Sequence, residues 1–240
     1  MVGIGPGNSS DRTHRAERAI ADSNVVVGYG RYIDAIADLT AGKEVVRSAM
    51  RQEIERVREA LRLASDGRIV ALVSSGDPGI YGMAGLALEL AKEMNMNLPV
   101  VIIPGVTAAS AAAAALGAPL MTDFAVVSLS DLLVPRQQIV KRLEALAQAG
   151  FVTVLYNPRS RTRTALLTEA LAIFRRHRPV ETPVGIVSDA SDEKQSVTLT
   201  DLAHVDEAGV DMRTIIVIGN KDTLEINRRM VTRRGYEVGT

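Results

Sequence analysis

Short runs of β-branched residues alternate with longer amphipathic segments along this whole chain, and that alternation is typical of an α/β protein. In the first half we expect strands at residues 2–4, 25–27, 69–73 and 100–103. The intervening segments predict helices at residues 12–23, 52–64, 81–94 and 108–116. Three of the four predicted strands lead directly into glycine-rich loops, so these loops are the candidate ligand-binding segments of the fold.

The alternation starts again after Gly117-Ala118-Pro119, where glycine and proline interrupt the pattern and the composition changes. Strands are predicted at residues 124–127, 151–156, 184–187, 196–199 and 214–218, and helices at 137–149 and 162–177. We therefore predict two α/β lobes of similar size, residues 1–118 and 119–240.

Composition excludes several classes of site. The absence of cysteine excludes disulfides, thiolate nucleophiles, zinc–thiolate sites and iron–sulfur clusters. His14, His177 and His204 lie far apart without metal-site spacing, so we expect no protein-bound metal. The 28 basic residues balance 28 acidic ones, and a protein without a basic excess is not expected to bind nucleic acid. The uncharged stretch 95–122 is broken by proline and glycine, so we expect no membrane span and a cytoplasmic location.

The first glycine-rich loop, Gly3-Ile4-Gly5-Pro6-Gly7, does not fit the dinucleotide-binding fingerprint. Asn8 stands where that fingerprint needs its last glycine, and Pro6 removes a backbone N–H from the turn. No acidic residue follows the second predicted strand, where one would hold a ribose. These departures argue against NAD or FAD. The helix that follows is predicted to be capped by one residue of the segment 9–11.

The other two loops, Ser75-Gly76-Asp77-Pro78-Gly79 and Pro104-Gly105-Val106-Thr107-Ala108, each end a predicted strand and open a predicted helix. In parallel α/β sheets ligands collect where strand ends and helix beginnings meet. Glycine allows a ligand to approach the backbone. Each loop taken singly is also explained by ordinary turn chemistry.

Taken in order, the three loops resemble those of the tetrapyrrole methylases, the S-adenosylmethionine-dependent family that serves cobalamin and siroheme synthesis. The shared motifs are G-x-G-P-G, then G-D-P, then P-G-V-T-A about 30 residues later, and the likeness covers essentially the whole chain. Within the family, the sequence most resembles the precorrin-3B C17-methyltransferase group. The stretches that carry this likeness are residues 27–33, 75–85, 119–121, 123–125, 128–133 and 156–160.

The resemblance implies a two-lobed α/β fold in which each lobe is a mixed sheet with flanking helices. It is not a Rossmann methyltransferase fold. S-adenosylmethionine is expected in the cleft between the lobes, held largely by backbone groups. The positions that match cofactor contacts are Pro6, Ser75, Gly76, Asp77, Ile80, Thr107, Ala108, Asn157 and Gly185. Asn157 stands where other members often have Met, so its backbone role transfers better than a side-chain role.

The implied substrate is a corrinoid lying in a trough over the N-terminal lobe. Its expected contacts are Gly5, Gly7, Tyr29, Arg31, Tyr32 and Arg159. Corrinoid precursors carry many carboxylates, so Arg31, Arg47 and Arg159 are suited to binding them. The family resemblance further implies a homodimer.

The C17 reaction is coupled to ring contraction, which moves protons at a hydroxyl and a carbonyl, so acid–base assistance is expected. Ser128, Ser130 and Asp131 are the candidate catalytic residues. The alternative is that Asp131 caps a helix or turn and that Ser128 lies in a strand. Two other functions stay open: another methylase of the same fold, acting on a different corrin precursor or a protein, or a non-catalytic nucleotide-binding module.

Overall fold

A computed structural model describes residues 1–236 of the chain. The chain divides into two compact units, Met1–Ala108 and Ala109–Thr240, and each is described by itself. The boundary predicted at residue 118 placed the alanine-rich helix in the first unit, whereas this division places it in the second. The short strand that follows this helix, β5 (Gly117–Ala118), pairs in parallel with β12 (Arg229–Thr232) of the second unit.

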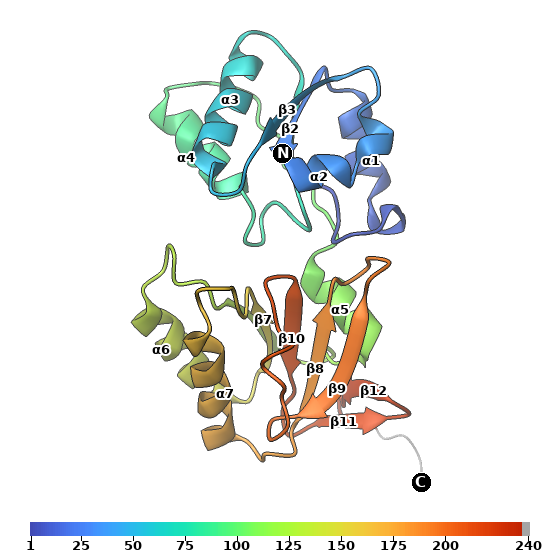
Figure 1. Ribbon diagram of the computed structural model, residues 1–240, viewed down its shortest axis with the longest axis vertical. Helices are drawn as coiled ribbons and strands as arrows, with labels where there is room; N and C mark the ends of the chain where they lie inside the picture. Colours follow the sequence, from blue (N-terminus) through green and yellow to red (C-terminus); the bar gives the residue numbers. More distant parts are fainter. Residues whose placement is uncertain (237–240) are drawn as a thin grey trace. The chain divides into compact units, whose positions relative to one another are not determined.

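The first unit is built on a four-stranded sheet in the order β1-β4-β2-β3 (Figure 1). Its strands are β1 (Val2–Gly3), β2 (Val25–Tyr29), β3 (Glu44–Ser48) and β4 (Val70–Ser74), and every strand pair is parallel. The helices are α1 (His14–Ala21), α2 (Gly30–Asp34), α3 (Glu53–Ser65) and α4 (Ala84–Glu93), with short 3-10 helices at Ser9–Asp11 and Ala37–Leu39. The carboxyl ends of these strands therefore all lie at the same edge of the sheet.

Both faces of this sheet are buried, which explains the continuous valine runs in its strands. Val25, Val27 and Leu72 point toward α3 and α4, where they pack with residues such as Val57. Val26 and its neighbours on the opposite face pack with the residues of α1 and α2 (Figure 1). Burial on both faces fixes the strands, and hence the positions at which the loops leave them.

The second unit contains a five-stranded sheet in the order β6-β7-β10-β8-β9. Its strands are β6 (Phe124–Ser128), β7 (Val152–Tyr156), β8 (Pro183–Ser188), β9 (Ser196–Asp201) and β10 (Thr214–Ile218). Only β6 and β7 pair in parallel, and the other pairs are antiparallel. A smaller sheet joins β11 (Thr223–Ile226), β12 and β5. The prediction of an α/β fold is confirmed.

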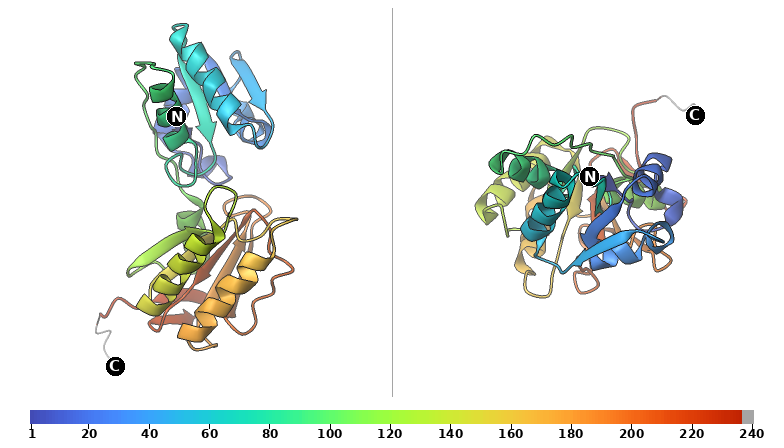
Figure 2. Two further views of the ribbon diagram at one scale, coloured as in Figure 1. Left: turned by 90° about the vertical axis from the view of Figure 1, so that its left-hand side faces the viewer. Right: turned by 90° about the horizontal axis from the view of Figure 1, so that it is seen from above.

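Helices cover both faces of the second sheet. The helices α6 (Arg136–Ala149) and α7 (Ala165–His177) lie side by side on one face (Figure 2) and form with it a core that includes Leu143, Leu171 and Phe174. The alanine-rich α5 (Ala108–Leu116) lies against the other face. Gly185 of β8 makes that contact possible, because a Cβ there would lie 2.4 Å from the methyl carbons of Leu116.

Several predicted elements differ from the observed ones. Residues 100–103 do not form a strand, since only Ile103 bridges Val2 and the side chains of Val101 and Ile102 are exposed. The neighbouring β1 has just two residues, so the ladder ends there. The helix predicted at residues 81–94 begins at Ala84, because Tyr81 has a φ of 54°, outside the helical region.

Other elements carried no clear sequence signal. They are α2, β3, β5, β11 and β12, which are short or exposed. Among residues 1–236 no helix is long and apolar enough to cross a membrane. Within the same residues no group of three or more His, Asp or Glu side chains is arranged to hold a metal ion.

Candidate functional site

The three glycine-rich loops of the first unit are joined through their backbones. Gly5 and Gly76 exchange two hydrogen bonds, in which the N–H of Gly76 donates to the Gly5 carbonyl at 2.7 Å and the reverse bond measures 3.3 Å. The N–H of Gly3 donates to the Ile103 carbonyl at 3.0 Å. Each loop follows the carboxyl end of a parallel segment, so the sheet brings the three predicted motifs to one edge.

The close approach of these loops explains two of their glycines. A Cβ at Gly105 would lie 2.1 Å from the Gly76 carbonyl oxygen and 2.9 Å from the Gly3 carbonyl carbon. A Cβ at Gly3 would lie 2.7 Å from the N atom of Gly105. Both glycines are therefore required by packing between loops, whatever else the loops bind.

Gly76 differs from these two glycines. Its φ is 60°, a left-handed conformation, and a Cβ there would have ordinary contacts, the nearest at 3.8 Å to the Cα of Thr107. The conformation requires glycine, while the surroundings leave space on that side of the backbone. Gly76, Thr107 and Ala108 thus form a neighbourhood of small residues that leaves space beside the backbone of Gly76.

The side chain of Asp77 ties the second loop to the third. One carboxylate oxygen accepts the N–H of Gly79 at 2.7 Å, and the other accepts the N–H of Gly105 at 3.1 Å. The same carboxylate therefore closes its own turn and holds the neighbouring loop. The sequence motif predicted that Asp77 belongs to the site, but not that its side chain has this role within the protein.

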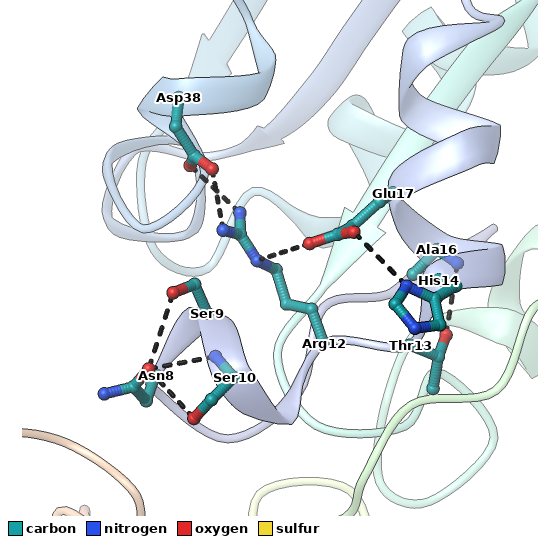
Figure 3. A network of polar contacts seen from close by, with 9 residues as sticks. All are labelled: Asn8, Ser9, Ser10, Arg12, Thr13, His14, Ala16, Glu17 and Asp38. Atoms are coloured by element: carbon teal, nitrogen blue, oxygen red, sulfur yellow. Dashed lines mark hydrogen bonds and ion pairs between the residues drawn. The ribbon is translucent and has the colours of Figure 1, made fainter.

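A polar network fixes the segment that follows Gly5, Pro6 and Gly7 (Figure 3). The Oδ1 of Asn8 accepts the N–H of Ser10 at 2.9 Å and so caps the 3-10 helix, while Thr13 caps α1 by accepting the N–H of Ala16. The cap predicted within residues 9–11 is therefore wrong. The polar residues there belong to a separate 3-10 turn, and α1 starts only after it.

Arg12 anchors this segment. Its side chain, which is 5% exposed, donates two hydrogen bonds to the carboxylate of Asp38, at 2.9 and 2.7 Å (Figure 3). Hydrogen bonding to Arg12 lowers the pKa of Asp38 and raises the pKa of the guanidinium. The loop that carries Pro6 and Gly7 is thus held by a doubly hydrogen-bonded ion pair between a buried arginine and an exposed aspartate.

The predicted substrate residues near the end of β2 lie close to one another. The rings of Tyr29 and Tyr32 meet edge to face with their centroids 5.2 Å apart. Arg47, which we considered for carboxylate binding, instead pairs with Asp34 at 2.7 Å. Its charge is compensated within the first unit.

In the second unit the structure brings Ser128, Ser130 and Asn157 together at the carboxyl ends of β6 and β7. The Nδ2 of Asn157 donates to the Oγ of Ser128 at 3.0 Å, and the N–H of Ser130 donates to the same oxygen at 3.2 Å. Asn157 has a φ of 50°, a conformation that asparagine tolerates better than most residues. This clustering agrees with a shared role, which stays a prediction.

Arg163 completes this cluster, and the sequence analysis did not identify it. Its guanidinium donates to the Asn157 carbonyl at 2.9 Å and to the Oγ of Ser130 at 3.3 Å. The signal available was the repetition of arginine at residues 159, 161 and 163 immediately after the resembling stretch. Tyr156 was missed too: its hydroxyl accepts the N–H of Ala109 at 2.7 Å in the first turn of α5.

The remaining predicted residues are placed less specifically. Asp131 is exposed, and within residues 1–236 its side chain makes no hydrogen bond, so the alternative that it caps a helix or turn is not seen. The N-cap position of α6 is occupied by Pro135. Arg159 donates to the carbonyl oxygen of Glu207. Ile80 is 40% exposed, in the turn that leads to α4.

Glycine-rich loops at the carboxyl ends of parallel strands are typical of α/β proteins that bind a small ligand. The chain belongs to the tetrapyrrole (corrin/porphyrin) methylases, whose family model matches residues 1–206. It is therefore a methyltransferase of that family, as the motifs predicted.

Individual relatives agree with this assignment. A protein of Salmonella typhimurium named "Probable cobalt-factor III C(17)-methyltransferase" is 45% identical over 236 residues, which cover 98% of each chain. A crystal structure of "the methyltransferase CobJ" superposes with a TM-score of 0.92 at 34% identity, covering 97% of this chain and 98% of the other. Uroporphyrin-III C-methyl transferase from Thermus thermophilus, solved in complex with S-adenyl homocysteine, shares the fold with a TM-score of 0.66 at 24% identity, over 91% of this chain and 95% of that one.

Proposed function

We propose that this protein transfers a methyl group from S-adenosylmethionine to C17 of precorrin-3B or its cobalt-containing counterpart, with ring contraction, in cobalamin biosynthesis. The observation that carries the proposal is the joining of the G-x-G-P-G, G-D-P and P-G-V-T-A loops at one edge of a parallel sheet. The names of full-length relatives support the choice of carbon and substrate.

The glycine-rich loops of the first unit offer hydrogen-bond donors and space that suit S-adenosylmethionine. Gly76 has space on one side of its backbone, and Thr107 and Ala108 lie at the start of α5, where main-chain N–H groups suit a ligand's carboxylate and hydroxyl oxygens. We assign the predicted cofactor contact of Asp77 to its main chain, because its side chain is oriented by the N–H groups of Gly79 and Gly105 and connects the two loops. Bound there, the cofactor supplies an electrophilic methyl group.

The other predicted cofactor residues keep their assignment under this proposal. They are Pro6, Ser75, Ile80, Asn157 and Gly185. For Gly185 there is a competing explanation, since its lack of a side chain is already needed for the contact with Leu116. Methyl transfer from a sulfonium needs positioning and exclusion of water more than it needs strong acids or bases.

The hydrogen bonds at Ser128 and Ser130 suit them to assist ring contraction. A serine hydroxyl has one proton to donate and two lone pairs. The Oγ of Ser128 accepts from Asn157 and from the N–H of Ser130, and the Oγ of Ser130 accepts from Arg163. Both O–H protons are therefore left to donate to a substrate oxygen on which negative charge develops.

The proposal is tested by incubating the protein with labelled S-adenosylmethionine and a panel of purified corrin precursors. We expect one methyl group to be added to precorrin-3B or its cobalt counterpart, and far slower transfer to precursors methylated at other carbons. Preferred transfer to another precursor would identify a different corrin methylase. Adenine-ligand binding without transfer to any precursor would identify a binding module. A homodimer located in the cytoplasm is part of the same proposal.

A further inference from the structure

Arg163 lies among uncharged groups at the ends of β6 and β7. Its guanidinium donates to the Asn157 carbonyl, to the Oγ of Ser130 and, at 3.4 Å, to the sulfur of Met212. Its Nε is buried and has no hydrogen-bond partner. Within residues 1–236 no carboxylate lies within ion-pairing distance of this guanidinium.

This lack of a carboxylate distinguishes Arg163 from many arginines of the chain. Arginines that pair with Asp or Glu include Arg12, Arg47, Arg62, Arg68, Arg136, Arg176 and Arg213. A half-buried guanidinium keeps its charge, and that charge is more favourable when an anion contacts it. Arg163 therefore has a positive charge that the described part of the chain does not compensate.

Among the other arginines for which residues 1–236 supply no carboxylate partner, Arg56 and Arg178 have a structural explanation that does not apply to Arg163. Arg56 and Arg178 are 4% and 7% exposed and donate to backbone carbonyls from inside the two units. Burial lowers the pKa of Arg178 to about 10, which leaves it charged at neutral pH. Arg163 is only half-buried and follows the carboxyl end of a parallel strand, where a ligand can reach it.

The segment after β6 also carries exposed apolar side chains. Leu132 and Leu133, which follow the cluster residue Ser130 in sequence, are 70% and 96% exposed. Exposed leucines in the segment that follows Ser130, which accepts a hydrogen bond from Arg163, suit a ligand with an apolar framework and carboxylate substituents. A tetrapyrrole is a molecule of this kind.

We infer that Arg163 binds a carboxylate substituent of the tetrapyrrole and thereby orients it against Ser128 and Ser130. The inference rests on the proposed function for the identity of the substrate, but not for the chemistry that Arg163 recognises. The fixed bonds to Ser130 and Asn157 hold the guanidinium in place, while a further N–H of NH1 is left to donate to a ligand carboxylate.

The test compares the full-length wild type with Arg163→Met, Arg163→Lys and the matched control Arg161→Met. Arg161 lies in the same loop, is exposed, and makes no hydrogen bond or ion pair within residues 1–236. For each protein we measure kcat and the KM for the tetrapyrrole, the Kd for S-adenosylhomocysteine, and the melting temperature. We also measure the Kd for uroporphyrin, a polycarboxylate tetrapyrrole, because that titration requires no turnover.

We expect Arg163→Met to raise the KM and the uroporphyrin Kd about tenfold, the loss typical of one charge-assisted hydrogen bond. S-adenosylhomocysteine affinity should be unchanged, Arg163→Lys should recover part of the loss, and Arg161→Met should behave as the wild type. If the wild type transfers no methyl group, the proposed function fails, and the uroporphyrin titration still decides the role of Arg163.

Three results would overturn the inference. One is an equal loss in Arg161→Met, which would indicate a general charge effect. Another is a lower kcat or weaker S-adenosylhomocysteine binding with unchanged KM and uroporphyrin Kd, which would make Arg163 a residue that only positions Ser130 and Asn157. The third result applies if Arg163→Met does not fold. In that case, a folded Arg163→Lys protein whose KM and uroporphyrin Kd equal those of the wild type would overturn the inference.

Discussion

The carboxylate of Asp77 accepts the backbone N–H of Gly105 at 3.1 Å, and so connects the loop after β4 to the loop that leads into α5. The two residues belong to motifs that are 28 positions apart in sequence. Since a Cβ at Gly105 would lie 2.1 Å from the Gly76 carbonyl oxygen, the two loops touch backbone to backbone. The shape of these glycine-rich loops therefore depends on the side chain of Asp77 and on the absence of side chains at Gly3 and Gly105.

Replacing Asp77 with Asn is expected to weaken this connection. An amide presents an N–H where one of the carboxylate oxygens now accepts an N–H, so one of the two bonds is lost. We expect a loss of about 1–2 kcal/mol of stability and weaker binding of S-adenosylhomocysteine. Denaturant unfolding and calorimetry measure the two effects. Asp22→Asn, an exposed position, is the control, and equal losses in the two variants would contradict the account.

Gly105→Ala is expected to be strongly destabilising. The added methyl group would overlap the Gly76 carbonyl, and backbone atoms cannot move aside as a flexible side chain does. Overpacking of this kind costs on the order of 3 kcal/mol. The contrasting variant is Gly85→Ala in α4, where a Cβ would meet nothing within 4 Å. There we expect a gain of about 0.5–1 kcal/mol, because alanine favours a helix. Thermal unfolding of the two variants measures both changes in stability. Similar changes in Gly105→Ala and Gly85→Ala would contradict the prediction.

The ion pair between Arg12 and Asp38 predicts part of the acid sensitivity. Hydrogen bonding lowers the pKa of Asp38 below its ordinary value of 3.8 in the folded protein. A carboxyl group with a lowered pKa stabilises the fold above its unfolded pKa, and that contribution is lost as the pH falls through the folded pKa. Asp38→Asn should therefore be less stable than the wild type near neutral pH, with a difference that shrinks below about pH 4.

Urea unfolding across that pH range measures the difference. Asp22→Asn serves as the control, since Asp22 makes no side-chain ion pair within residues 1–236. A difference between wild type and Asp38→Asn that stays constant down to low pH would show that the pair does not couple stability to this titration.

The sequence predicted the elements whose apolar pattern is distinct. Val25–Val27 in β2 is a continuous apolar run, as expected of a strand buried on both faces, and α3 has buried residues such as Val57 and Leu61 at helical spacing. β3 was missed because it lies at the sheet edge with an exposed first residue and an exposed Arg47. Residues 100–103 were apolar enough to suggest a strand, but apolar composition does not reveal that the neighbouring strand has two residues.

The candidate site was likewise predictable only in part. Its loops could be predicted, because glycine, proline and aspartate at fixed spacings are visible in one sequence. The side-chain connections could not, since they join residues that only the fold brings together. Asp77 with Gly105 and Arg163 with Ser130 are two such connections. Asp131, predicted together with Ser128 and Ser130, is exposed and makes no side-chain hydrogen bond in residues 1–236, and its catalytic role stays a prediction.

The central claim is methyl transfer to C17, and the most direct measurement locates the transferred carbon. The protein is incubated with S-adenosylmethionine carrying a carbon-13 methyl group and with precorrin-3B or its cobalt counterpart, and the product is examined by NMR. The account predicts a single labelled methyl group on C17 of a ring-contracted product. A labelled methyl group on any other carbon, or an unlabelled tetrapyrrole recovered from a protein that binds the cofactor, would contradict it.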